Sequence, residues 1–313
     1  MAEFKNKIGD LDVYPLALGG NVFGWTADRE ESFAVLDAYA GGGGNFVDTA
    51  DTYSAWVEGH RGGESEEIIG EWLAARGGRD RMVLATKVGA HPEHRGLAAG
   101  TIRAAAEASL RRLRTDRIDL YYTHTDDLTV PVEEIITALD ELVREGKVRH
   151  IGVSNIEPER LEASLAFSDR EGKAKYVAIQ AHYNLVSRDT YEGARMRIAR
   201  EHALAAVPYY GLASGFLTGK YRAGVRVDSA RAKKAGAHLG TERGRKVLDV
   251  LDEIAADRGV PVPTVALAWL LARPTVVAPI ASARTVRQVP ALLKVAELAL
   301  TAEEVERLTA ASA

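Results

Sequence analysis

The feature that most constrains the fold is an alternation of short apolar runs with longer amphipathic stretches along the chain. Each run has the length of a strand, and uninterrupted apolar strands are typical of parallel sheets that are buried on both faces. Eight such runs, separated by helical stretches, predict an α/β fold of the closed (β/α)₈ type, a TIM barrel. The predicted strands cover residues 16–18, 46–48, 82–86, 119–122, 150–154, 176–180, 205–208 and 276–280.

The stretches between these runs predict helices. In residues 132–145, Ile135 and Leu139 lie on one apolar face, Pro131 suits the first turn and Gly146 ends the helix. The other predicted helices before the eighth strand cover residues 30–40, 65–76, 101–114, 158–167, 191–201, 241–258 and 263–273.

The end of the chain has room for two more helices after the eighth strand, and the last opens with a capping box at residues 301–304. No linker or low-complexity segment divides the chain. We therefore predict a single domain over residues 1–313, a barrel with two additional helices.

Composition excludes several classes of protein. The chain has no cysteine, which rules out disulfides and thiolate metal sites and fits a reducing compartment. A net charge of -4 gives no overall field that attracts nucleic acid. The N-terminus lacks the apolar stretch of a signal peptide, and the apolar run 265–272 is broken by Arg273 and Pro274. We expect a cytoplasmic protein without nucleic-acid or membrane partners, with a monomer slightly favoured.

Four polar residues stand at or just beyond the ends of predicted strands: Asp48, Tyr53, Lys87 and His124. In a (β/α)₈ barrel the carboxyl ends of the strands open onto one face, where active sites form. These four side chains can therefore meet. Taken singly, each also has a structural interpretation, such as Asp48 capping a turn or Tyr53 lying on the rim.

Other sites are not supported by the motifs. The glycine run 41–44 precedes a strand and lacks the G-x-G-x-x-G spacing of a Rossmann site. Gly219 and Lys220 lack the remaining residues of a P-loop, because Ser214 and Tyr221 stand where the first glycine and the final Ser or Thr belong. The eight histidines show no metal-binding spacing, so we expect no metal site.

Several motifs occur in the order found in one known family. They are FVDTADTYS, ATKVG, IDLYYTH, IGVSN, GFLTGKY and PIASAR. Together they resemble the aldo-keto reductase superfamily, and the resemblance runs from about Leu16 to Gln288. Within it, NVFGW at 21–25 and GGESE at 62–66 are similar to bacterial members related to the general stress and potassium-channel β-subunit branches.

This resemblance implies a reductase that moves hydride from NADPH to an aldehyde or ketone, with Asp48, Tyr53, Lys87 and His124 as catalytic residues. Hydride addition places negative charge on the carbonyl oxygen, so a proton donor is needed, and Tyr53 would be the general acid. A neighbouring Lys87 ammonium would lower the pKa of the phenol from its usual value of about 10. Asp48 would hold Lys87, and His124 would orient the carbonyl.

The resemblance also implies an NADP(H) site. Ser154, Asn155 and Gln180 would hydrogen-bond the nicotinamide carboxamide, and Tyr209 would stack on the ring. The pyrophosphate would lie along residues 212–220, where glycines permit close backbone approach. The predicted cofactor-binding residues are Gly20, Asn21, Asp48, Ser154, Asn155, Gln180, Tyr209, Leu212, Gly215, Leu217, Gly219, Lys220, Ile280, Ser282, Arg284 and Gln288.

NADPH is preferred over NADH in this interpretation, because Ser282 and Arg284 follow the eighth strand and a guanidinium suits the 2′-phosphate. The adenine end departs from the family pattern. Leu292 stands about where many members carry a polar adenine contact, and Pro290 interrupts the usual helical run. The adenine contacts therefore stay open.

Two further features leave alternatives open. Residues 222–246 carry eight Lys or Arg against Asp228 and Glu242, and are either a flap that closes over the cofactor phosphates or an ordinary solvated loop. Trp25, Trp56 and Thr125 are candidate substrate contacts. Phe23 and Tyr183 could line the same apolar wall, but each of these four aromatic residues is at least as compatible with core packing.

Two functions remain at this point. The first is NADPH-dependent reduction of a small-molecule carbonyl compound. The alternative is a redox-sensing or regulatory module that binds NADP and turns over little, in the manner of channel β-subunits. An intact set of four catalytic residues favours the enzyme. The carbonyl substrate and the physiological direction do not follow from the sequence, because loop conformation determines the pocket.

Overall fold

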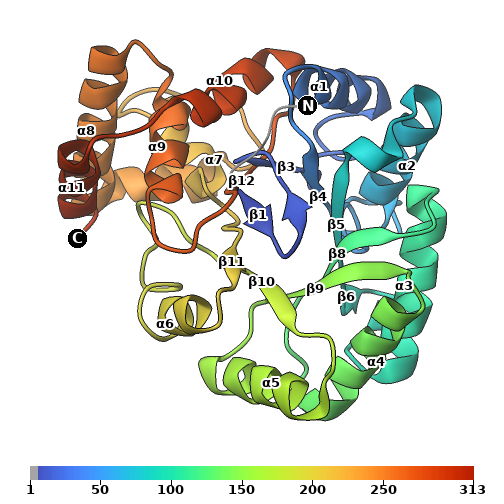
Figure 1. The fold of residues 1–313 in the computed structure, drawn as a ribbon. Helices are drawn as coiled ribbons and strands as arrows, with labels where there is room; N and C mark the ends of the chain where they lie inside the picture. Colours follow the sequence, from blue (N-terminus) through green and yellow to red (C-terminus); the bar gives the residue numbers. More distant parts are fainter. Residues whose placement is uncertain (1–5) are drawn as a thin grey trace.

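The computed structural model describes residues 6–313, so the first five residues of the predicted domain lie outside the described part. Its centre is a parallel sheet of eight strands surrounded by helices (Figure 1). The strand order is β11-β10-β9-β8-β5-β4-β3-β12. The strands are β3 (Ala17–Gly19), β4 (Phe46–Asp48), β5 (Val83–Val88), β8 (Ile118–Thr123), β9 (Val148–Ser154), β10 (Tyr176–Gln180), β11 (Ala205–Ala206) and β12 (Ile280–Ala281).

The sheet closes on itself between its two edge strands. Ala206 in β11 forms a parallel bridge with Val276, and the Val277 amide donates to the Ala206 carbonyl at 2.9 Å. On its other side, β12 pairs with β3. The predicted (β/α)₈ barrel is confirmed. The seventh and eighth strands are shorter than predicted because Pro208 and Pro279 have no amide hydrogen to continue a ladder.

A hairpin that was not predicted covers the amino-terminal end of the barrel. Strands β1 (Lys7–Ile8) and β2 (Leu11–Asp12) pair antiparallel, and Ile8 and Leu11 pack into the apolar interior of the barrel. Gly9 in the turn has φ +59°, and a Cβ there would lie 2.7 Å from the His150 ring. A two-residue turn between apolar residues is a hairpin signal that could have revealed this element.

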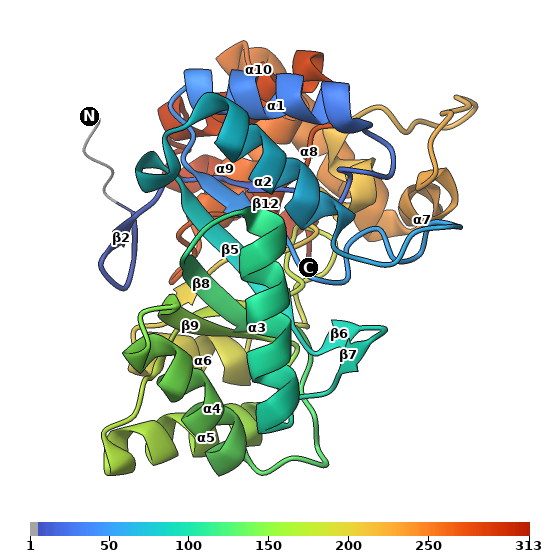
Figure 2. The same cartoon turned by 90° about the vertical axis from the view of Figure 1, so that its right-hand side faces the viewer.

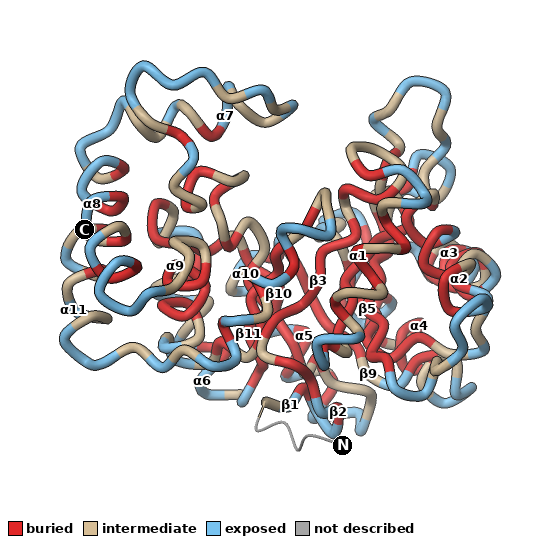
Figure 3. Tube along the Cα trace, turned by 90° about the horizontal axis from the view of Figure 1, so that it is seen from above, coloured by how far each residue is buried: buried red, intermediate tan, exposed pale blue. Residues whose placement is uncertain are grey.

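Helices cover the outside of the barrel, and a second apolar cluster fills the space between them and the strands. Figure 3 shows buried segments on the strands and on the inner sides of the helices, with exposed segments outside. The helices are α1 (Arg29–Gly41), α2 (Glu64–Arg76), α3 (Ala99–Leu113), α4 (Val132–Arg144), α5 (Pro158–Glu171), α6 (Ala194–Glu201), α7 (Ala232–Gly236), α8 (Glu242–Arg258), α9 (Val262–Leu271), α10 (Val289–Leu293) and α11 (Ala302–Ala311).

Helix ends follow local chemistry. The capping box of α11 is confirmed, because the Glu304 amide donates to the Thr301 hydroxyl at 3.2 Å and the Thr301 amide donates to the Glu304 carboxylate at 2.7 Å. Helix α6 begins at Ala194 instead of residue 191, since Gly193 takes φ +98° and separates the preceding turn. Residues 222–246, treated above as one segment, contain α7, a short 3₁₀ turn and the first residues of α8.

The two ends of the barrel carry different elements. Figure 2 shows the β1–β2 hairpin at one end and, at the other, α7 and the short hairpin of β6 (Ala90–His91) and β7 (His94–Arg95). Within residues 6–313 no single helix is long and apolar enough to cross a membrane; only α8 and α9 taken together, bent by 101°, pass that test of length and composition.

Candidate active site

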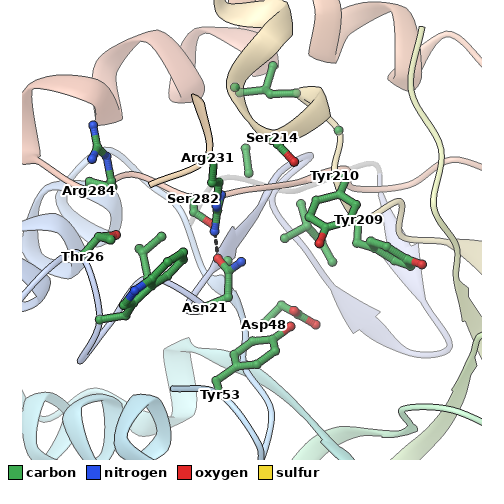
Figure 4. Close-up of a pocket in the computed structure, with 18 of the residues that line it drawn as sticks. Asn21, Thr26, Asp48, Tyr53, Tyr209, Tyr210, Ser214, Arg231, Ser282 and Arg284 are labelled. Atoms are coloured by element: carbon green, nitrogen blue, oxygen red, sulfur yellow. Dashed lines mark hydrogen bonds between the residues drawn. The ribbon is translucent and has the colours of Figure 1, made fainter. Parts of the chain in front are cut away.

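A pocket of about 420 Å³ opens where the strands end at their carboxyl termini. Figure 4 shows Asp48 and Tyr53 on one side of it, Arg231 and Arg284 on another, and Tyr209 and Tyr210 on a third. Most of the predicted site residues line this pocket: Asn21, Trp25, Asp48, Tyr53, Trp56, His124, Ser154, Asn155, Gln180, Tyr209, Leu212, Gly215, Lys220, Ile280, Ser282, Arg284 and Gln288.

Five predicted site residues do not line the pocket. Lys87 lies beneath it, fully buried, and reaches it only through its partners. Gly20 and Gly219 belong to segments whose neighbours line it, and Leu217 is fully buried behind it. Thr125 is exposed and stands apart from the lining.

Lys87 joins Asp48 and Tyr53 in one hydrogen-bonded cluster. Its ammonium Nζ donates to Asp48 Oδ2 at 2.7 Å and to the Tyr53 hydroxyl oxygen Oη at 2.9 Å. A third bond, to the Thr49 carbonyl at 2.7 Å, uses the remaining N–H. Lys87 and Asp48 are 0% and 1% exposed. The ammonium therefore has all three protons engaged in a site without water contact.

The register of the sheet explains this meeting. Asp48 pairs with Ala85, two residues before Lys87, so both side chains point to the same side of neighbouring strands. Backbone bonds then carry the chain from Asp48 over the end of β5, because the Thr49 amide donates to Ala85 and the Asp51 amide to Lys87. The turn that follows places Tyr53 above the ammonium.

The pKa of Tyr53 differs from the sequence expectation. It is raised to about 12, because burial, the largest cause, and the charge of Asp48 raise it by more than Lys87 lowers it. The expected net lowering is wrong, because loss of water around the phenolate outweighs the attraction of the ammonium. Burial also disfavours the Lys87 ammonium, but Asp48 and Tyr53 outweigh burial and raise the Lys87 pKa. At neutral pH the phenol and the ammonium therefore both hold their protons.

His124 lies beside Tyr53, with ring centroids 6.0 Å apart and an edge-on angle of 76°. Burial, followed by the Lys87 charge, lowers the pKa of His124 to about 3. Its Nδ1 atom is buried and has no hydrogen-bond partner among residues 6–313. The imidazole is therefore neutral at physiological pH and can act as a hydrogen-bond donor without carrying a charge.

The four residues predicted to hold a nicotinamide gather at the ends of β9, β10 and β11. The Asn155 side chain donates to the His124 carbonyl at 2.9 Å and accepts from the Tyr209 hydroxyl at 2.8 Å. It also donates to the Ser154 hydroxyl at 3.0 Å. Gln180 donates to Asp48 Oδ1 at 2.8 Å. This polar group is thus bonded directly to two of the proposed catalytic residues.

The segment after β11 has a strained backbone. Tyr210, Ala213 and Ser214 have φ values of 55°, 47° and 59°, a region that residues other than glycine rarely occupy. Gly211 packs closely enough that a Cβ would lie 3.2 Å from the Ile280 carbonyl. Such strain clusters at ligand sites, and here it lies in and beside residues 212–220.

Three cations border the same part of the pocket: Lys220, Arg231 and Arg284. None of them takes part in any ion pair that residues 6–313 form. Burial, followed by Arg284 and Arg231, lowers the pKa of Lys220, so the three charges repel one another. Unpaired like charges at a pocket wall are suited to an anionic ligand.

A family model supplies the observation that decides the identity. Residues 15–313 match the model described as the aldo/keto reductase family. The chain belongs to this family. It is therefore an oxidoreductase, and the family uses nicotinamide cofactors. The predicted place among the general stress and channel β-subunit branches remains a prediction.

Named relatives agree with this assignment. The aldo-keto reductase ausK of Aspergillus calidoustus is 34% identical, covering 95% of this chain and 78% of the relative. An uncharacterized oxidoreductase, YrpG of Bacillus subtilis, is 36% identical over 94% of this chain and 90% of its own. An aryl-alcohol dehydrogenase [NADP(+)] of Phanerodontia chrysosporium is 31% identical, with 95% and 82% covered.

Some residues of this aldo/keto reductase pocket were missed from the sequence. Arg231 is the most prominent: it comes from the segment before α7, and its guanidinium carbon lies 5.3 Å from the centre of the Trp25 ring. Tyr210 and Thr52 stand next to predicted residues and had no separate signal. The lining residues outside the predicted set of site residues are Gly19, Val22, Thr26, Thr52, Tyr210, Gly211, Ser214, Thr218, Ser229, Ala230, Arg231 and Ala281.

The candidate substrate residues separate into two groups. Trp25 and Trp56 stand edge to face, with centroids 5.6 Å apart, and Trp56 lies 6.1 Å from Tyr53. Trp56 is 51% exposed, so an aromatic surface remains free beside the Tyr53 phenol. Phe23 and Tyr183 are fully buried and pack in the core.

Other ligand contacts are limited by the same geometry. Leu292 is buried in the core, so its side chain offers no adenine contact, and the Gln288 amide oxygen accepts from the Arg284 backbone at 2.7 Å. Within residues 6–313 no group of three or more His, Asp or Glu side chains is arranged to hold a metal ion.

The His124 pKa leads to a prediction for the pH dependence of this reductase. Since His124 stays neutral, kcat/KM for carbonyl reduction is expected to be level between about pH 5 and 7. Folding lowers the His124 pKa from 6.5 to about 3. Its contribution to stability is therefore present above pH 6.5 and is lost as the pH falls towards 3. A pH–rate profile of the wild type and of His124→Gln checks this. An inflection near the ordinary histidine pKa that disappears in the variant would show that His124 titrates after all.

Proposed function

We propose that this protein reduces an aldehyde or ketone to an alcohol with NADPH, and that Tyr53 is the general acid. The observation that carries the proposal is the Lys87 ammonium, which bonds both Asp48 and the Tyr53 hydroxyl at the base of a pocket lined by the predicted nicotinamide contacts. A bound nicotinamide supplies the hydride. The protein must then supply a proton to the carbonyl oxygen.

Tyr53 suits that role because burial keeps it protonated at neutral pH. When its proton passes to the carbonyl oxygen, a phenolate remains at Tyr53 Oη. Lys87 Nζ, 2.9 Å away, stabilises that negative charge, and Asp48 keeps the ammonium charged and in place. The neutral His124 ring beside Tyr53 can donate to the same carbonyl oxygen and fix its position.

The cofactor residues fit NADP(H) by the chemistry of their donor groups. Ser154, Asn155, Gln180 and Tyr209 offer amide and hydroxyl groups at one end of the pocket. Lys220, Arg231 and Arg284 offer unpaired positive charge for phosphates. The proposed flap role of residues 222–246 is supported by Arg231, which reaches the pocket from this segment. The NADP(+) in the name of the Phanerodontia relative also supports the choice of cofactor.

A parallel screen of small aldehydes and ketones with NADPH and NADH tests this function. We expect carbonyl-dependent loss of the reduced nicotinamide absorbance, faster with NADPH at equal concentration. Activity that needs no nicotinamide would contradict the proposal. Tight NADP(H) binding without turnover over the whole panel would favour the redox-sensing module instead.

Arg284→Leu tests the preference for the phosphorylated cofactor within the same screen. Loss of a charge-assisted contact to phosphate is expected to weaken NADPH binding by about 1.5–3 kcal/mol, or roughly 10- to 150-fold, while NADH binding changes little. Arg287→Leu is the matched control, because Arg287 is exposed and three residues away but does not line the pocket. Equal losses for both cofactors would argue against a role at the 2′-phosphate.

A further inference from the structure

One hydrogen bond links Gln180, a predicted nicotinamide contact, to the cluster of Asp48, Lys87 and Tyr53. Gln180 Nε2 donates to Asp48 Oδ1 at 2.8 Å, while Asp48 Oδ2 accepts from Lys87 at 2.7 Å. Gln180, Asp48 and Lys87 are 2%, 1% and 0% exposed. Both carboxylate oxygens of Asp48 are therefore engaged, one by the ammonium and one by the amide.

The orientation of the Gln180 amide follows from chemistry. Asp48 is paired with an ammonium and acts as a carboxylate, which only accepts hydrogen bonds. The atom that faces it must therefore be the amide nitrogen. The Gln180 carbonyl oxygen has no hydrogen-bond partner among residues 6–313, and Gln180 lines the pocket. One side chain thus contacts both the pocket and the Asp48–Lys87 pair.

Tyr122 is a neighbour of Gln180 in the barrel interior. Its side chain is fully buried, and its ring fills the space over Gly152, where a Cβ would lie 2.4 Å from the ring. Burial, followed by Asp48, raises the pKa of the Tyr122 hydroxyl well above its usual value, while Gln180 acts in the opposite direction. The Gln180 amide is therefore next to Tyr122 as well as Asp48.

We propose that Gln180 is a positioning residue that acts through Asp48 and Lys87 on the proton of Tyr53, and so couples occupation of the nicotinamide end of the pocket to the readiness of the acid. This inference rests on the proposed function. The donated N–H partly offsets the negative charge of Asp48, which otherwise favours the protonated form of Tyr53. Loss of the donor shifts the Tyr53 equilibrium towards the protonated phenol.

Other groups can influence the same proton. Tyr122, His124 and Tyr210 face the cluster, Arg231 lies on its pocket side, and Asp51 is buried close to Lys87. A test must therefore compare variants that leave these groups in place. Gln180→Met keeps the length and packing of the side chain but removes the donor.

The matched control is Ser154→Ala. Ser154 is also a proposed nicotinamide contact and is 1% exposed, but its hydroxyl bonds Asn155 and not Asp48. If Gln180 only binds cofactor, the two variants should behave alike. If Gln180 acts on the proton, only Gln180→Met should change the dependence on pH.

Two measurements follow. In alcohol oxidation with NADP⁺, where Tyr53 must be deprotonated, Gln180→Met is expected to move the rising limb of kcat to higher pH by about half a unit, a roughly threefold change in the proton equilibrium. Calorimetry in buffers of different ionisation enthalpy measures the protons released on NADP⁺ binding, without turnover. That release should move to higher pH in the same variant. Ser154→Ala should weaken binding in both experiments without moving either pH dependence.

The outcomes are distinct. Unchanged pH dependence in Gln180→Met, with binding weakened as in Ser154→Ala, overturns the inference and leaves the proposed function intact. A wild type that neither binds nor uses nicotinamide overturns the proposed function itself. If Gln180→Met does not fold, Gln180→Asn shortens the amide by one methylene group and breaks the same contact, and wild-type pH dependence in that variant likewise counts against the inference.

Discussion

Replacing Tyr53 by Phe is expected to lower kcat/KM for aldehyde reduction by roughly 10²- to 10⁴-fold, the scale associated with a positioned proton donor. The ring, its packing against Trp56 and the position of His124 should persist, since only the hydroxyl is removed. NADPH binding should therefore change little. Steady-state kinetics and direct titration of the cofactor separate the two effects.

Tyr191→Phe is the matched control for that experiment. Its hydroxyl also makes a partly buried hydrogen bond, to Thr275 at 2.6 Å, but Tyr191 does not line the pocket. We expect lower stability and unchanged turnover. A Tyr53→Phe enzyme with turnover close to that of the wild type would exclude Tyr53 as the acid, whatever the behaviour of the control.

Replacing Lys87 by Met is expected to lower the free energy of unfolding by about 3–5 kcal/mol and to abolish most activity. The stability effect arises because Asp48 would remain buried with a charge but without its ammonium partner. The activity effect arises because the phenolate of Tyr53 would lose its stabilising charge. Urea unfolding and initial rates measure the two quantities independently.

The Lys87→Met prediction has two controls. Lys246→Met removes an ammonium from an exposed pair with Glu242, and its urea midpoint should match that of the wild type. The double variant Lys87→Met with Asp48→Leu removes both charges and should regain part of the lost stability, while activity stays low. A stable and active Lys87→Met protein would mean that the buried pair neither holds the site nor serves the chemistry.

The contact between Asp48 and Lys87 could be predicted from the sequence, because it depends only on where the strands lie and on which strands are neighbours. Apolar runs fix the strands, parallel strands align their carboxyl ends, and neighbouring strands place those two residues side by side. Tyr53 follows because only a short turn separates it from Asp48. Their distances confirm that these groups are brought together.

Other features required the folded structure. Arg231 belongs to a basic segment whose composition fits a solvated loop as well as a flap, and only the fold shows that its side chain reaches the pocket. The sign of the Tyr53 pKa shift depends on the balance between burial and two opposite charges, and no sequence pattern reports that sum.

The contact between Gln180 and Asp48 illustrates a third limit. The two residues are 132 positions apart and stand on strands that are not neighbours in the sheet, so pairing rules do not bring them together. They meet across the interior of the barrel, at a distance set by its curvature and by the side chains packed below. Strand assignment alone does not give that distance.

The join between β11 and the chain just before β12 is the weakest in the wall of the barrel, and it bears on how a bound ligand changes the stability of the protein. Strands β11 and β12 contain two residues each, and a single bridge, between Ala206 and Val276, joins β11 to the chain that leads into β12. Residues 209–220 follow β11 on one side of this join, residues 282–288 follow β12 on the other side, and both segments border the pocket. A long ligand that contacts both segments would hold the two sides of the join together. Binding in the pocket would then raise the free energy of unfolding of the whole barrel, because the ligand would connect the strands where the fewest residues are paired.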